Sequence, residues 1–66
     1  MIFTEIEKKI IELIADEYNA QAIAQKLKLT VKSVVGYKER LRKKTGSLNS
    51  IGVVVYAIKN KIIEIS

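Results

Sequence analysis

The sequence predicts an all-α domain of four helices, with residues 1–66 forming a single domain. Side chains that cap helix N-termini recur along the chain, and apolar residues follow each of them at helical spacing. The 66 residues include no proline and only three glycines, so no segment resembles a linker or a repeat. A chain of this length buries only about 60% of its unfolded surface, so it needs very regular helices or a partner.

The first predicted helix begins at Thr4, because Thr4 and Glu7 have the spacing of a capping box. It ends in the polar residues 16–19. Its apolar stripe consists of Ile6, Ile10, Leu13 and Ile14.

Two further helices are predicted to form a helix-turn-helix corner. Asn19 caps the first of them, whose small apolar residues allow a neighbouring helix to approach closely, and the chain breaks at residues 28–30. Thr30 caps the second, which we expect over residues 31–44. Gly46 then ends it, because glycine readily takes the left-handed conformation that closes helices.

The fourth predicted helix covers residues 50–60, with Asn49 or Ser50 as its cap. It contains more apolar side chains than one helix face can bury. The side chains expected to face inward are Ile51, Val54 and Ile58, with Val55 as a further inward contact. Val53 and Tyr56 are expected outside the core of the monomer, where they would mark an interface.

Charge is distributed unevenly along the chain. Residues 1–20 carry a net charge of −3, whereas residues 26–44 carry eight cationic side chains against one carboxylate, a net charge of +7. A basic block beside an acidic one suggests a face that binds a polyanion. The alternative is an ordinary solvated helix rich in lysine.

The basic helix is predicted to be amphipathic. If Val34 marks the inward direction, a rotation of 100° per residue brings Leu41 to the same side. Also expected on this side are Val31, Thr45 and, toward one edge, Tyr37. The opposite face contains Lys32, Gly36, Glu39 and Lys43, flanked by Ser33 and Arg40. Such a helix fits the major groove of B-DNA, about 12 Å wide, with its N-terminal side chains at base edges and other cations at phosphates.

Two residues of the outward face do not fit a simple basic surface. Gly36 inside a helix costs about 1 kcal/mol of helix stability relative to alanine. Either this glycine permits close approach of the backbone to another surface, or it is simply tolerated in a helix that packing already stabilises. Glu39 would be repelled by phosphates unless it accepts a hydrogen bond from cytosine or pairs with a cation. We favour an intrahelical pair with Lys43, four residues on.

Several motifs stand at fixed spacing along nearly the whole chain, over about residues 3 to 63. They are Phe3-Thr4-x-x-Glu7, Ile10, Leu13-Ile14-Ala15, Ile23-Ala24-x-x-Leu27-x-Leu29-Thr30-Val31-Lys32-Ser33-Val34 and Leu41-x-x-Lys44-x-Gly46. Together they resemble the LuxR-type (GerE-type) helix-turn-helix domain of NarL/FixJ-like response regulators and quorum-sensing regulators.

The resemblance implies a cytoplasmic bacterial transcriptional regulator whose third helix reads double-stranded DNA and whose fourth helix mediates homodimerisation. A receiver or sensor domain can precede such a domain. The expected DNA-binding residues are Lys28, Thr30, Lys32, Ser33, Gly36, Tyr37, Arg40, Lys43 and Lys44, with Lys38 as a further phosphate contact. The expected dimer interface contains Val53, Tyr56 and Ile62; contact with a sensor domain would explain the same residues.

The sequence also departs from the family pattern. At three positions that the family often uses for contacts it has Val35, Gly36 and Glu39, none of which donates a hydrogen bond from its side chain. Val35 could touch a thymine methyl group or serve in packing. The departures support a second hypothesis, in which a degenerate helix-turn-helix docks on a protein partner through its fourth helix.

Enzymatic function is not expected. Without histidine or cysteine, imidazole and thiolate chemistry are absent, and no catalytic residue, metal or cofactor is predicted. The N-terminus lacks the apolar run of a signal peptide. Charged residues interrupt the apolar stretch 51–65, so no membrane span is predicted.

Overall fold

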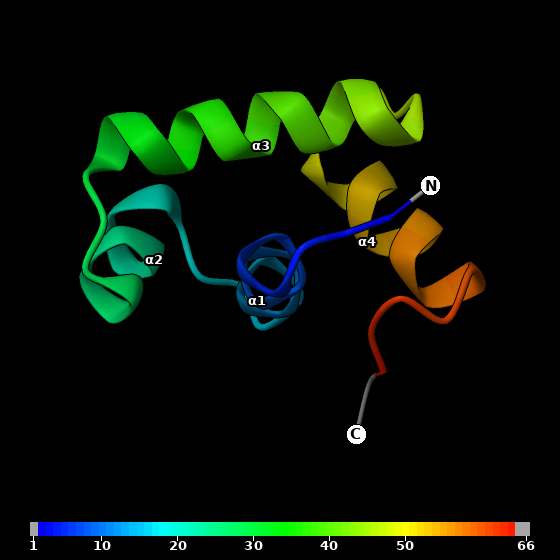
Figure 1. Ribbon diagram of the computed structural model, residues 1–66, viewed down its shortest axis with the longest axis horizontal. Helices are drawn as coiled ribbons and strands as arrows, with labels where there is room; N and C mark the ends of the chain where they lie inside the picture. Colours follow the sequence, from blue (N-terminus) through cyan, green and yellow to red (C-terminus); the bar gives the residue numbers. More distant parts are fainter. Residues whose placement is uncertain (1, 65–66) are drawn as a thin grey trace.

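Four α-helices surround one core in the computed structural model, which describes residues 2–64 (Figure 1). They are α1 (Glu5–Ala15), α2 (Ala20–Leu27), α3 (Val31–Thr45) and α4 (Ser50–Lys59). The described residues contain no strand, so the predicted all-α class with four helices is confirmed. The predicted extent 1–66 and the apolar stretch to Ile65 include residues outside the described range.

Each helix begins at a residue whose side chain accepts a backbone N–H, as predicted. Thr4 and Glu7 form the capping box: the Glu7 N–H donates to Thr4 Oγ1 (3.2 Å), and the Thr4 N–H donates to Glu7 Oε1 (2.8 Å). The caps of α2, α3 and α4 are Asn19, Thr30 and Asn49. Of the two alternatives for α4, the cap is therefore Asn49. Each cap contributes about 1 kcal/mol.

Helix α3 lies across the other three helices (Figure 1). It packs against α2 near its N-terminus, against α4 near its C-terminus and against α1 between them. Helices α1 and α2 also contact each other, as do α1 and α4. One long side of α3 is therefore left uncovered by the rest of the described chain.

The turn between α2 and α3 closes without glycine. Lys28 takes the left-handed conformation (φ 57°), and the Leu29 N–H donates to the Ala24 carbonyl at 2.9 Å. Leu29 packs against the core, which holds the corner in place. At the other end of α3, Gly46 takes the left-handed conformation (φ 68°), as predicted.

The core is formed by all four helices. Its fully buried large side chains are Ile10, Ile11, Ile23, Val34, Leu41 and Val53. Ile11 was absent from the predicted stripe of α1, whereas Ile6, Leu13 and Ile14 are only half-buried. Because α1 has neighbours on several sides, it buries more than a single stripe.

Of the side chains of α4 expected to face inward, only Val54 does so: it is half-buried and packs against the core, whereas Ile51, Val55 and Ile58 are exposed. Val53, expected outside the core, is only 1% exposed, whereas Ile51 is 73% exposed. Tyr56 is half-buried and packs its ring 6.5 Å from that of Phe3. The inward face is set by Val53 and the fully buried Ala57, a residue too small to stand out among larger apolar neighbours.

Val31 was also expected to face inward, but it is 42% exposed. It lies at the first position of α3, whereas α4 packs against the other end of that helix (Figure 1). This side of the first turn therefore remains partly open to solvent.

A partly buried ion pair joins the start of α1 to the end of α3. The Lys44 Nζ lies 3.0 Å from Glu7 Oε1 and 4.6 Å from the centre of the Phe3 ring. Glu7 is buried. Burial raises the pKa of Glu7, but hydrogen bonds from the Thr4 backbone and the Lys44 ammonium lower it more, so the pKa lies below its usual value.

Removal of the Glu7 charge is expected to destabilise the fold. Because the folded-state pKa is depressed, the contribution of Glu7 is present above pH 4.5 and is lost as the pH falls through the folded pKa. We expect Glu7→Gln to lower the free energy of unfolding at pH 7 by about 1–3 kcal/mol, measured by urea denaturation followed by circular dichroism. Exposed Glu12→Gln on the same helix serves as control. Equal stability of the two variants would contradict the structural role of the pair.

Candidate nucleic-acid interface

Helix α3 buries two residues on one side, and these define its uncovered side as the opposite one. Val34 and Leu41 are both 0% exposed. On the opposite side, beside the exposed carboxylate of Glu39, stand four further exposed polar side chains: Lys32 and Lys43, flanked by Ser33 and Arg40. We call these four residues the α3 outer face. It contains three cations and one hydroxyl, groups that suit hydrogen bonding to phosphate or to base edges.

Arg40 is oriented by its neighbour Tyr37. The guanidinium carbon lies 4.6 Å from the centre of the Tyr37 ring, which is half-buried at the edge of the core. A cation–π contact of this kind limits the conformations of a long, exposed side chain. Tyr37, predicted as a DNA contact, thus contacts the guanidinium group of Arg40.

Two hydroxyls are coupled at the N-terminus of α3. Thr30 Oγ1 accepts from the Ser33 N–H (3.1 Å) and donates to Ser33 Oγ (2.9 Å). The Ser33 hydroxyl thereby keeps its own proton for an outside acceptor. Lys28, exposed in the turn, lies close by in the chain. The predicted residues 28, 30, 32 and 33 are therefore gathered at one end of the helix.

Lys44, also predicted as a DNA contact, lies apart from this group. Its ammonium is engaged by Glu7, and its side chain is only 28% exposed. Sequence spacing alone did not reveal this partner, which is 37 residues away. We therefore leave Lys44 out of the candidate interface.

Gly36 has no structural requirement within the chain. A Cβ atom at this position would meet nothing within 4 Å, and the residue lies inside a regular helix. Gly52, by contrast, is needed for packing, because a Cβ there would lie 2.9 Å from the Cβ of Ser47.

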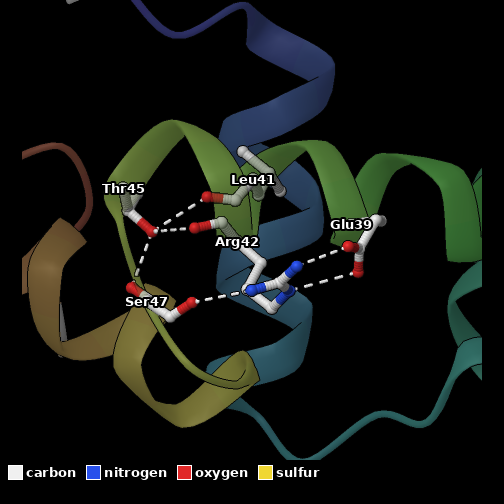
Figure 2. Close-up of polar contacts among 5 residues, drawn as sticks. All are labelled: Glu39, Leu41, Arg42, Thr45 and Ser47. Carbon is white, nitrogen blue, oxygen red and sulfur yellow. Dashed lines mark hydrogen bonds and ion pairs between the residues drawn. The ribbon is translucent and has the colours of Figure 1, made fainter.

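Glu39 pairs with Arg42 and not with Lys43, so the predicted partner was wrong (Figure 2). Arg42 donates twice, from Nη2 to Oε1 (2.6 Å) and from Nε to Oε2 (3.2 Å). The hydrogen bonds from Arg42 lower the pKa of Glu39, so the carboxylate stays ionised near neutral pH. The planar guanidinium matches both carboxylate oxygens, which a lysine ammonium cannot do.

Arg42 is itself anchored to the turn after α3. Its Nη1 donates to the Ser47 carbonyl at 3.3 Å. The Thr45 hydroxyl lies 2.8 Å from the Leu41 carbonyl and 2.6 Å from Ser47 Oγ (Figure 2). The turn, Arg42 and Glu39 therefore form one connected polar group beside the outer face.

Other kinds of site find little support in the described residues. Between residues 2 and 64, no group of three or more acidic side chains is placed to hold a metal ion. No helix in this range is long and apolar enough to cross a membrane. An open hollow of about 380 Å³ lies between α1, α2 and the segment at Ile63, away from the α3 outer face.

Comparisons with known proteins point to a regulatory relative. The chain is 36% identical over 63 residues to the oxygen regulatory protein NreC of Staphylococcus aureus, with the same values for strains JH9, JH1 and Mu3. The aligned residues are 96% of this chain but only 29% of each relative, so the chain spans less than a third of their length. No protein-family model matches the chain, and no solved structure matches it significantly.

Proposed function

We propose that the chain is the DNA-binding domain of a bacterial transcriptional regulator, a LuxR-type helix-turn-helix that reads the major groove with α3. The observation that carries the proposal is the α3 outer face, where three exposed cations lie opposite the fully buried Val34 and Leu41. The 36% identity to a protein named as an oxygen regulatory protein supports a regulatory role. The proposed role is binding without catalysis or a cofactor.

The proposed contacts divide by position along α3. Lys32 and Ser33 lie in the first turn and are proposed to contact base edges, because side chains near the N-terminus of the recognition helix do so in other helix-turn-helix proteins. Arg40 and Lys43 lie further along and are proposed to contact phosphates, together with Lys28 in the turn. Three other residues expected to bind DNA have supporting roles in this proposal. Thr30 and Tyr37 contact Ser33 and Arg40, and Gly36 leaves the helix backbone open to a close approach.

We also propose that residues 1–66 act as one module of a longer cytoplasmic regulator. The relatives are about three times as long as the aligned region, which leaves room for a receiver or sensor domain before a module of this kind. Such a domain would supply the signal to which the regulator responds.

We propose homodimerisation through α4, on a face that replaces the predicted one. Ile51, Val55 and Ile58 are 73%, 43% and 38% exposed and stand at i, i+4 and i+7. We call these three residues the α4 stripe. At 100° per residue they lie opposite Val53 and Ala57, so α4 is apolar on both sides. A helix that is apolar all round is normally covered on both sides.

A second candidate function is a protein-interaction module. The α4 stripe fits it equally well, and Val35 and Gly36 contribute no hydrogen-bonding side chain to the outer side of α3. The two functions differ in one observable, because only the first requires α3 to bind duplex DNA.

The cations of the α3 outer face are expected to determine DNA affinity. We expect Lys32→Ala, Arg40→Ala and Lys43→Ala each to weaken binding to a mixed-sequence duplex by roughly fivefold at low salt, about 1 kcal/mol. The slope of log affinity against log salt should become shallower by about 0.9 for each phosphate contact removed. Fluorescence anisotropy at several salt concentrations measures both quantities.

Lys9→Ala provides the matched control, because Lys9 is an exposed lysine of α1 beside the hollow and away from the α3 outer face. It changes the net charge by the same amount and should leave affinity nearly unchanged. If all four variants bind alike, α3 does not bind DNA. If the unmodified chain binds no duplex at low salt, the protein-interaction function is favoured.

Gly36 is expected to lower the free energy of unfolding while allowing the α3 backbone to approach DNA closely. Gly36→Ala should raise the free energy of unfolding by about 1 kcal/mol, since the added methyl group meets nothing in the fold. If the α3 backbone approaches DNA closely at this position, the same variant should bind duplex at least fivefold more weakly. Denaturation and anisotropy on one preparation test both parts. Higher stability with unchanged affinity would mean that this glycine has no part in binding.

Self-association is expected to depend on the α4 stripe. Val55→Glu should shift the chain toward monomer in sedimentation equilibrium while retaining its helical circular dichroism, because Val55 lies outside the core. Ile2→Glu is the control, since Ile2 is 86% exposed but lies outside the stripe. An unmodified chain that stays monomeric at high concentration would rule out the dimer.

A further inference from the structure

The carboxylate of Glu39 is held in a fixed orientation beside the α3 outer face. Both of its oxygens accept from Arg42, and Arg42 is tied to the Ser47 carbonyl at the end of the helix (Figure 2). The Glu39 side chain is nevertheless 52% exposed. A carboxylate has about four acceptor positions, so two hydrogen bonds from Arg42 leave others free for an outside donor.

An outside donor would meet little competition on this side of α3. Val35 and Gly36, one turn earlier, have no side-chain group that could form a hydrogen bond with the carboxylate. The positive charge of Arg42 offsets that of Glu39, which reduces the repulsion that an unpaired carboxylate would meet among phosphates. An acidic side chain can therefore lie in a DNA groove at this position.

The chemistry of the major groove determines what such a carboxylate can bind. Guanine presents only acceptors there, and thymine presents an acceptor and a methyl group. Cytosine presents its N4 amino donor, and adenine presents an N6 amino donor beside the N7 acceptor. An ionised carboxylate accepts but does not donate, so adenine N7 would repel its second oxygen, whereas cytosine has no acceptor beside its amino group.

We propose that Glu39 is a specificity-determining residue that accepts a hydrogen bond from the N4 amino group of a cytosine, with Arg42 as the positioning residue that orients it. This inference rests on the proposed binding of α3 in the major groove. It assigns a role in sequence selection to a residue that is unfavourable for DNA affinity as such.

Selection from a random duplex library, followed by sequencing, tests the proposal. The unmodified chain should enrich duplexes with cytosine at one position by roughly 5- to 150-fold over the other bases. Glu39→Gln should move the preference at that position from cytosine to adenine, because an amide can both donate to N7 and accept from N6. Glu39→Ala should remove the preference at that position and leave the other positions unchanged.

Glu12→Gln is the matched control, because Glu12 is an exposed glutamate of α1; it should enrich the same motif as the unmodified chain. Circular dichroism of each variant verifies that it is folded. If Glu39→Gln and Glu39→Ala select the unmodified motif, Glu39 does not read a base and the inference is overturned while the proposed function stands. If no chain, including the unmodified one, enriches any sequence, the proposed function fails and the inference fails with it.

Discussion

The rotation of α3 about its own axis is fixed by the burial of Val34 and Leu41, and the candidate interface depends on it. These residues stand seven positions apart, so they lie within about 20° of the same direction. Both are completely buried, which stabilises the fold by about 2 kcal/mol for each side chain. A turn of α3 in either direction would expose them. The positions of Lys32, Arg40 and Lys43 on the opposite side follow from this constraint.

The two ends of α3 are fixed by different contacts. Those at its C-terminus engage two cationic side chains, which reduces the positive charge available to a partner. The N-terminus is held by the corner at Leu29, whereas the C-terminus is held by the ion pair of Lys44 with Glu7 and by the contacts of Arg42 with Glu39 and Ser47. Two of the cations in the basic block therefore have acidic partners within the chain. Net charge alone overstates the attraction for a polyanion, and the exposed cations of the α3 outer face are the better measure.

The features that the sequence predicted correctly depend on residues close together in the chain. A helix cap depends on residues three positions apart, so Thr4, Asn19 and Thr30 could be identified without knowledge of the fold. Burial depends on which helix lies opposite, so the spacing of Ile51, Val54 and Ile58 gave an inward face for α4 that misses the buried Val53 and Ala57. Ion-pair partners depend on geometry and on distant residues. The spacing of Glu39 and Lys43 suited an ion pair, but Arg42 forms a bidentate pair with both carboxylate oxygens of Glu39 instead.

The proposed functions of α3 and α4 use separate surfaces, and the small size of the domain gives a reason for both. The α3 outer face and the α4 stripe share no residue. One domain presents few cations to DNA, so alone it would bind weakly and lose much of its affinity at raised salt. Joining two copies through α4 would make the second contact intramolecular and raise the overall affinity without any new contact to DNA. It would also fix the spacing of two half-sites, which a single recognition helix cannot specify.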